Sequence, residues 1–173
     1  MEKEQNNDAR LFEFLVDIKR VSKVVEGGRR FAFAACVVVG NKAGSAGFAH
    51  ATANEVATVK KKALNAAKKR MITISLYKNR TIYHDVYSKS GATKIMLRSA
   101  PAGTGVIAGG TAIRTFLTAV GIKDIVAKSF ASSNSYNTLQ ATVNALKNVY
   151  SPREIAIKRG KNIDDIFFVD SKN

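Results

Sequence analysis

Arg20-Val21-Ser22-Lys23-Val24-Val25-Glu26-Gly27-Gly28-Arg29-Arg30 is the most informative stretch of this chain. Apolar residues recur at every second position on both sides of it: Phe12, Phe14, Val16 and Ile18 before, Phe31, Phe33, Ala35 and Val37 after. Such alternation is typical of β-strands with one buried face. A tight turn needs a positive φ, which glycine adopts without steric cost, so Gly27 and Gly28 predict a β-hairpin.

The tip of this hairpin has an unusual charge. Five cations gather there against a single acid, Glu26: Lys19, Arg20, Lys23, Arg29 and Arg30. Like charges on paired strands repel one another, so a hairpin that served only the fold would not concentrate them. We therefore expect the tip to meet an anionic partner.

The whole chain is basic. Its 173 residues include 28 Lys and Arg against 13 Asp and Glu, which gives a formal net charge of +15. The excess is present in both halves of the sequence, which excludes a neutral domain with a basic tail. A net charge of this sign and size indicates a polyanion, and nucleic acid is the class we expect.

Other features of the composition concern the compartment. Cys36, the one cysteine, lies in an apolar run and is expected to be a small buried side chain rather than a reactive thiol. The N-terminus lacks the order of a signal peptide, and no apolar run approaches the roughly 20 residues of a membrane span. We expect an intracellular protein without membrane contact.

The first unit, residues 11–74, is predicted to be β-β-β-α. Its three strands and its helix are expected at 11–25, 29–40, 45–52 and about 54–70. Thr52 or Asn54 can cap the helix, with Glu55 in its first turn. Positions 35–39 are apolar without alternation, so both faces of the second strand should be covered.

The predicted helix has one apolar stripe and one basic face. Small residues recur at helical spacing and allow close packing on a sheet: Val56, Val59, Ala63, Ala66 and Ala67. Cations without interleaved acids cover much of the rest: Lys60, Lys61, Lys62, Lys68, Lys69 and Arg70. Such a run is either a solvated face or a phosphate-binding one, and the C-terminal cluster favours phosphate contact more.

The second unit, residues 75–160, is predicted to be β-β-α-β-α. Its elements are expected at 81–87, 93–98, 111–120, 123–130 and 136–149, with a last helical turn from Pro152. Gly121 is a normal C-cap for the first of its helices. Residues 1–10 and 161–173 are polar ends that we expect to be flexible.

Gly103-Thr104-Gly105-Val106-Ile107-Ala108-Gly109-Gly110 resembles a relaxed dinucleotide fingerprint, with Asp124 near the distance at which an acid would hold a ribose. That fingerprint requires a strand directly before the glycines, whereas Ser99-Ala100-Pro101-Ala102 intervenes and the Walker lysine is missing. We expect instead a tight loop that lets two backbones approach closely. The helix that starts there can also meet a phosphate.

The sequence gives little support for catalysis. His50 and His84 lie in strand-like segments without metal-ligand spacing, Asp164-Asp165 lies near the end, and no serine is in a nucleophile elbow. We expect no enzyme activity, cofactor, metal or small-molecule substrate. Phe12, Phe14, Phe31 and Phe33 could stack on bases, although core packing is favoured.

The residues alone thus support a basic two-part α and β protein that binds RNA or DNA. The β-β-β-α unit is compatible with the double-stranded-RNA-binding fold, which reads duplex shape rather than sequence.

Several short segments, in one order along the chain, resemble the bacterial small-subunit ribosomal protein five family. The segments are Arg20-Val21-Ser22-Lys23, Gly27-Gly28-Arg29, Val38-Val39-Gly40, Gly47-Phe48, Glu55-Val56, 103–110, Ala127-Lys128-Ser129, Ser132-Ser133-Asn134 with Asn137, Ala141-Thr142 and Lys158-Arg159-Gly160-Lys161. The resemblance covers about residues 11–168.

The resemblance implies an α+β fold: a double-stranded-RNA-binding-like N-terminal domain, then a C-terminal β-α-β-type domain with a left-handed crossover. It implies a structural constituent of the small subunit of cytoplasmic ribosomes, near the junction of head and body. The implied partners are small-subunit (16S-type) ribosomal RNA and small-subunit proteins four and eight. The resemblance implies that the chain contributes to translational accuracy together with protein four. It also implies that the hairpin tip, Arg20 to Arg29, reaches ribosomal RNA near the neck, a region where the family is linked to spectinomycin sensitivity.

Charge pattern and resemblance together predict two sets of contact residues. Ribosomal RNA is expected at Lys19, Arg20, Ser22, Lys23, Gly27, Gly28, Arg29, Arg30, Lys60, Lys61, Lys68, Lys69, Arg70 and Lys128. A second loop, for RNA or a partner protein, comprises Gly103, Thr104, Gly105, Gly109, Gly110, Ser132 and Asn134.

The chain departs from the family pattern at three places. Ala51-Thr52-Ala53-Asn54 lacks a basic residue that the family tends to carry at the helix entrance, which weakens the case for RNA contact there. The 131–135 turn lacks the family's glycine and proline, and Gln140 stands where a basic residue is common.

A free-standing double-stranded-RNA regulator and a nucleotide-using enzyme are the alternative functions.

Overall fold

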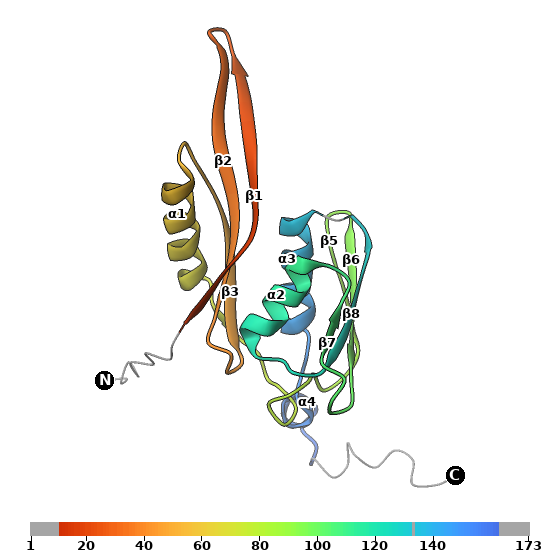
Figure 1. The fold of residues 1–173 in the computed structure, drawn as a ribbon. Coiled ribbons are helices and arrows are strands. Elements are labelled where there is room, and N and C mark those ends of the chain that lie inside the picture. Colours follow the sequence, from red (N-terminus) through yellow and green to blue (C-terminus); the bar gives the residue numbers. More distant parts are fainter. Residues whose placement is uncertain (1–10, 133, 163–173) are drawn as a thin grey trace.

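The computed structural model describes residues 11–132 and 134–162 (Figure 1). Its strands are β1 (Phe12–Val25), β2 (Gly28–Gly40), β3 (Ser45–Ala53), β4 (Ile72–Thr73), β5 (Val86–Ser90), β6 (Thr93–Ser99), β7 (Val106–Ala108) and β8 (Ile125–Ala131). Its helices are α1 (Val56–Lys69), α2 (Thr111–Val120), α3 (Ser135–Lys147) and α4 (Pro152–Arg159).

The elements form four layers, seen from one side to the other in Figure 1. Helix α1 covers one face of the first sheet, which has the strand order β1-β2-β3-β4. Helices α2 and α3 lie between that sheet and the second sheet, which has the order β5-β6-β8-β7. Both faces of the first sheet are thus covered at its centre.

Strand β2 shows how its sequence produces this double covering. Ala35, Val37 and Val39 pack against the apolar stripe of α1. Cys36 and Val38, the residues between them, belong to the core formed with α2 and α3. The prediction that both faces of 35–39 are covered is confirmed.

Cys36 is buried, as predicted. Its side chain is 3% exposed, and burial, followed by the nearby negative charge of Asp17, raises the pKa of its thiol to about 11. The thiolate is therefore absent at neutral pH, and Cys36 acts as a small apolar residue of the core.

Three glycines allow elements to approach closely. A Cβ on Gly40 would overlap the carbonyl of Ala119 in α2, and one on Gly121 would overlap the backbone of Lys42. A Cβ on Gly47 in β3 would likewise overlap the carbonyl of Ala67 in α1. These glycines set the distances between layers.

The second unit contains a β-α-β unit, although its first strand, β7, was not among the strands expected from the sequence. Strands β7 and β8 are parallel neighbours and are joined through α2. Strand β8 also pairs antiparallel with β6, which pairs antiparallel with β5. The α+β class is confirmed, and the left-handed sense of the crossover stays a prediction.

The structure corrects several expected boundaries. Thr52 and Asn54 do not cap α1: β3 continues through Ala53, and Glu55 is the N-cap residue, without a side-chain capping bond. Strands β4 and β7, two and three residues long, were not expected. Residues 81–87 and 93–98 were expected to form a hairpin with its turn over Ser88–Gly91. The first strand, β5, lies instead at Val86–Ser90, and the turn at 91–92 has Gly91 at a φ of 56°.

The two ends of the chain, residues 1–10 and 163–173, lie outside the described residues, and Asp164-Asp165 lies there with them. Within 11–132 and 134–162, no helix is long and apolar enough to cross a membrane.

Candidate nucleic-acid interface

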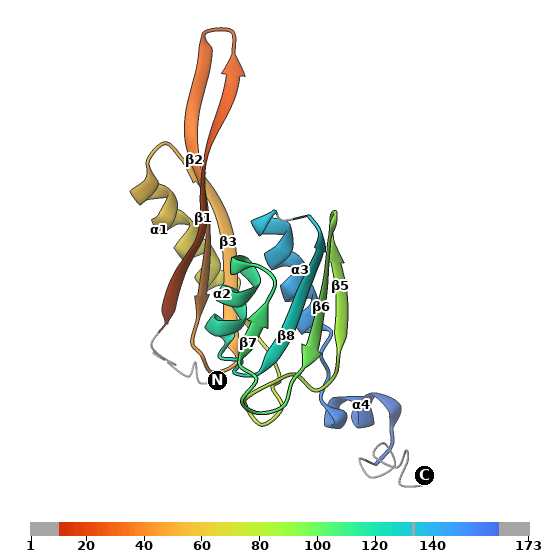
Figure 2. The ribbon, with the colours of Figure 1, turned by 45° about the vertical axis from the view of Figure 1, so that its right-hand side comes forward.

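The β1–β2 hairpin extends far beyond the rest of its sheet (Figure 2). Strand β3 ends at Ala53, which lies opposite Phe33 of β2. Beyond that pair, and as far as the last pair, Val25 and Gly28, strands β1 and β2 pair only with each other among the described strands. Residues 18–24 and 26–31 are exposed, so both faces of the outer hairpin are open to a partner.

A β-bulge in β1 determines which face each side chain of the hairpin occupies. Leu15 lies opposite Val37, and Asp17 lies opposite Cys36, so Val16 is an extra residue. An extra residue shifts the alternation by one position, so later side chains switch faces. Ile18 consequently shares a face with Ala35, on the α1 side, and the expectation that it continues the row of Phe12 and Phe14 is wrong.

Three cations of the hairpin lie on the face that continues the α2 and α3 side of the sheet. Lys19, Lys23 and Arg30 follow Asp17 on this face, and Lys23 lies directly opposite Arg30. Lys19 is close to an acid, with its Nζ 3.2 Å from the Asp17 carboxylate. All three cations are exposed, and the opposition of Lys23 and Arg30 is a repulsive pair that an anion would relieve.

The other face of the hairpin combines cations with apolar side chains. Arg20 and Arg29 lie there with Val24 and Phe31. The Cζ atom of Arg20 lies 3.9 Å from the centroid of the Phe31 ring, a cation–π contact. The Phe31 side chain is 49% exposed, so the expectation of core packing is wrong for this ring.

The other three phenylalanines of the hairpin fit the expectation of core packing better than Phe31 does. Phe14 and Phe33 pack against the two sides of the sheet core. Phe12 is half-buried, and the ammonium group of Lys42 lies 3.9 Å from its ring centroid.

The turn of the hairpin consists of Glu26 and Gly27. Gly28 adopts a φ of 114°, in agreement with the predicted need for glycine, and Gly27 does not adopt a left-handed φ. A Cβ on either glycine would meet no heavy atom of the described residues within 4 Å. Ser22 is exposed on the same face as Phe31.

The cations of α1 form two separate groups. Helix α1 follows β3 directly, so Lys60, Lys61 and Lys62 lie toward the hairpin end, whereas the 68–70 group lies at the far end beside Gly47. All six cations are exposed. Lys68 Nζ lies 3.3 Å from the Glu13 carboxylate of β1, an acid that the local sequence pattern did not reveal. Of the C-terminal group, Lys68 has an acid partner within the chain, and the stronger case for phosphate contact at this group stays a prediction.

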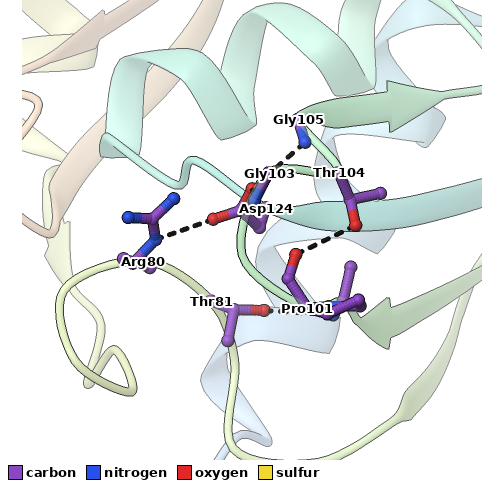
Figure 3. Close-up of polar contacts among 8 residues, drawn as sticks. Arg80, Thr81, Pro101, Gly103, Thr104, Gly105 and Asp124 are labelled. Atoms are coloured by element: carbon purple, nitrogen blue, oxygen red, sulfur yellow. Dashed lines mark hydrogen bonds and ion pairs between the residues drawn. The ribbon is translucent and has the colours of Figure 1, made fainter.

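The glycine-rich stretch is divided by β7 into two separate sites. At the first, the Asp124 carboxylate is buried beneath the loop (Figure 3). Its Oδ1 accepts hydrogen bonds from the amides of Gly103 at 2.9 Å and Gly105 at 3.1 Å, and its Oδ2 accepts one from Arg80 Nε at 2.8 Å. Thr104 closes the turn by donating to the Pro101 carbonyl.

These contacts determine the ionisation of Asp124. The Gly105 amide, the Arg80 guanidinium and the Gly103 amide lower the pKa of this carboxyl group, against the opposing effect of burial. Both carboxylate oxygens are occupied by the chain itself. The idea that Asp124 holds the ribose of a dinucleotide is therefore wrong.

The second site lies at the other end of β7. Gly109, Gly110 and Ser132 line an open cleft of about 450 Å³ together with Asp17 and Ser135. Lys128, exposed on β8, lies beside Gly109. Of the seven residues predicted to form one contact loop, only Gly109, Gly110 and Ser132 line the cleft.

The loop glycines serve a different purpose from the expected one. Gly103, Gly105 and Gly110 have φ values of 97°, 75° and 140°, and a Cβ on any of them would meet no described heavy atom within 4 Å. Conformational freedom, not close approach, is what these positions require. Asn134, another predicted contact, caps α3: its side-chain Oδ1 accepts a hydrogen bond from the backbone amide of Tyr136. The backbone amide of Asn134 donates to the Ser132 hydroxyl.

Family models of known proteins match both units of the chain. The model for the N-terminal domain of ribosomal protein S5 matches residues 11–75, and the model for its C-terminal domain matches residues 88–159. The chain belongs to the ribosomal protein S5 family. The N-terminal match contains the whole basic hairpin and α1, and the C-terminal match contains Asp124, Gly109 and Gly110.

Individual members of the S5 family match over most of their length. The small ribosomal subunit protein uS5 of Orientia tsutsugamushi is 58% identical over 154 residues, 89% of each chain. That of Rickettsia bellii is 53% identical over 171 residues, 99% of this chain and 97% of its own. That of Rickettsia prowazekii is 54% identical over 166 residues, 96% of this chain and 94% of its own.

The two histidines of this S5-family chain have structural surroundings. His50 is on β3, as expected, and its ring lies edge-on to Tyr136. His84 lies outside the strands, contrary to expectation, and accepts a hydrogen bond from the Tyr150 amide. Among residues 11–132 and 134–162, no cluster of His, Cys, Asp and Glu could hold a metal ion.

Proposed function

We propose that this chain is a structural constituent of the small ribosomal subunit and binds small-subunit ribosomal RNA. One observation carries the proposal: in a chain of the S5 family, five cations lie on a hairpin that extends beyond its sheet with both faces open. A surface that serves only solubility does not need such an arm. Phosphates on either side of the arm would neutralise its charges.

The fold supports this role by holding the base of the arm rigidly. The first sheet is covered on one face by α1 and on the other by α2 and α3, so the arm projects from a fixed base. A projecting arm reaches RNA that a flat surface would not. The cations fix its position on phosphates, and nothing in the arm is chemically reactive.

We assign secondary contacts to the remaining predicted residues. Lys60 and Lys61 extend the basic surface from the hairpin along α1. Lys128 and the cleft at Gly109 offer a second surface where the C-terminal unit meets β1. Lys69 and Arg70 are exposed cations whose contact with RNA rests on charge alone.

The finer parts of the role rest on family resemblance. In this proposal the chain lies in the cytoplasmic ribosome near the junction of head and body, contacts small-subunit proteins four and eight, and contributes with protein four to translational accuracy. Large apolar side chains exposed on the C-terminal unit support protein contacts there: Tyr77, Tyr87, Ile107 and Ile157.

In this proposal residues 11–74 and 75–160 are the two domains. The chain has no enzymatic role and no cofactor.

Sedimentation of the full-length tagged chain from its own cells tests the proposal. We expect the tagged chain in the small-subunit fraction, and we expect it to stay there after a moderate salt wash. Recovery only in the unassembled fraction would overturn the proposal. Binding to generic duplex RNA without preference for ribosomal RNA would instead favour a free-standing regulator.

A further inference from the structure

Phe31 has surroundings that the fold does not explain. It lies on the outer part of β2, beyond the last pair between β2 and β3, and its side chain is 49% exposed. Val24, on the same face of the hairpin, is 71% exposed. A solvated arm gains nothing from displaying these two apolar side chains, so a partner that covers them is expected.

Arg20 holds the Phe31 ring in place. Its guanidinium carbon lies 3.9 Å from the ring centroid, so the cation covers one side of the ring. Arg20 lies opposite Phe33, and Phe31 lies opposite Ser22, so the contact is diagonal between neighbouring pairs on one face. Diagonal neighbours are within reach of long and aromatic side chains, and the contact limits the motion of both.

The charges around Phe31 indicate the chemistry of its partner. Arg20 and Arg29 flank the ring on its own face, and Lys23 and Arg30 lie on the opposite face. A protein surface that covered Phe31 would also have to accommodate Arg20 and Arg29. A nucleotide offers in one unit a flat apolar base for the ring and a phosphate for the cations.

We propose that Phe31 and Arg20 together form a stacking platform for an unpaired base of the ribosomal RNA. This inference rests on the proposed function and adds to it that the arm binds a single-stranded or bulged nucleotide, not only phosphates. A base inside a duplex has both faces covered by its neighbours, whereas an unpaired base can stack on a ring or on a guanidinium plane. Arg20 contributes both to stacking and to charge, whereas Phe31 contributes only to stacking.

The absence of tryptophan from the sequence allows a direct test. Phe31→Trp in the full-length chain keeps an aromatic platform and places one fluorophore at the site. We expect it to bind 16S ribosomal RNA within about threefold of wild type and to lose fluorescence as a base stacks on the indole. Tyr87→Trp, at an aromatic residue 70% exposed on β5, is the matched control and should keep its fluorescence.

Phe31→Leu separates stacking from charge. Loss of one base–aromatic stack should weaken RNA binding about tenfold. The dependence of binding on salt should not change, because no cation is removed. The weaker binding should appear with 16S ribosomal RNA and with a hairpin RNA carrying an unpaired loop, and it should be absent with a perfect duplex.

Three outcomes would overturn the inference: full binding by Phe31→Leu, unchanged fluorescence of Phe31→Trp on saturation with RNA, or equal weakening on loop and duplex RNA. Failure of the proposed function gives a different result, because the wild-type chain would then not prefer ribosomal RNA at all. A contact of Phe31 with protein would appear as normal RNA binding by Phe31→Leu together with reduced incorporation into subunits, and it would also overturn the inference. Thermal unfolding of Phe31→Leu, Phe31→Trp and Tyr87→Trp checks that the fold of each variant is intact.

Discussion

Gly40, the last residue of β2, lies against the carbonyl of Ala119 in α2 with no space between them for a side chain. Two backbone hydrogen bonds join the same segments: the Lys42 amide donates to the Ala119 carbonyl at 3.0 Å, and the Gly44 amide donates to the Val120 carbonyl at 2.8 Å. The core between β2, β3, α2 and α3 is continuous with this contact. The base of the basic arm and the C-terminal unit therefore form one packed body.

Gly40→Ala should destabilise the whole chain. The added methyl group must displace the backbone of either β2 or α2, and overpacking of this kind costs about 1–3 kcal/mol. Urea unfolding followed by circular dichroism measures the change. Gly27→Ala is the matched control, because a Cβ there meets no described atom within 4 Å, and it should change stability by less than about 0.5 kcal/mol. Equal stability of the two variants would contradict the tight contact.

Substitutions of Asp124 should distinguish its two roles. The amides of Gly103 and Gly105 both donate to Oδ1, and Arg80 donates to Oδ2. Asp124→Asn can keep the two loop bonds and loses the Arg80 pair. Asp124→Ala leaves both amides without their acceptor and should lower Tm further, by roughly 5 °C relative to Asp124→Asn.

The pH dependence gives a second measurement on Asp124. Its folded pKa lies below the ordinary value of 3.8, chiefly because of the Gly105 amide and then Arg80. Its contribution to stability is therefore present above that ordinary value and is lost as pH falls through the lowered folded value. The difference in Tm between wild type and Asp124→Asn should be largest near neutral pH and shrink below about pH 3.8. A difference that grew on acidification would exclude this ion pair as its cause.

Ser135→Ala should change the ionisation of Asp17. The Ser135 hydroxyl of α3 donates to Asp17 Oδ2 of β1 at 2.8 Å, and this bond is the largest cause of the lowered pKa of Asp17. Lys19 lowers that pKa as well, through a hydrogen bond and through its charge. Removal of the hydroxyl should raise the Asp17 pKa toward 3.8, measured by carbon-detected NMR titration of the carboxyl group. An Asp17 pKa left unchanged by Ser135→Ala would show that the bond to α3 is not maintained in solution.

Local pattern was sufficient to predict much of the N-terminal unit. Alternating apolar residues and two glycines placed β1 and β2 within a few residues of their observed bounds. The continuous apolar run 35–39 revealed the covering of both faces of β2. These features depend on side chains a few positions apart, which a sequence displays directly.

Features set by distant contacts could not be predicted in the same way. The bulge at Val16 leaves no compositional mark, yet it moves Ile18 to the opposite face of the sheet. The close approach of Gly40 to Ala119 leaves no sign in the sequence, because the two residues are far apart along the chain. Asp124 resembled a ligand-binding acid, because nothing nearby in the sequence shows that the loop amides bond Oδ1 and that Arg80 bonds Oδ2.

Removal of cations from one face of the arm should reduce RNA binding and its salt dependence together. Lys19, Lys23 and Arg30 share a face of the hairpin, and all are exposed. Removing one phosphate-binding cation flattens the plot of log K against log salt by about 0.9 on duplex RNA and about 0.7 on single strands. Alanine at all three positions should therefore flatten the slope for 16S ribosomal RNA by up to about 2 to 3.

The control for this variant removes equal charge elsewhere. Lys89, Lys94 and Lys123 are exposed on the C-terminal unit and were not predicted to bind RNA. Alanine at these three positions lowers the net charge by the same amount but should leave the slope within about 0.5 of wild type, because distant exposed charges are screened beyond roughly 10 Å. Equal flattening by the two triple variants would mean that RNA responds to total charge. Flattening confined to the hairpin variant would mean that the phosphates lie on the arm itself.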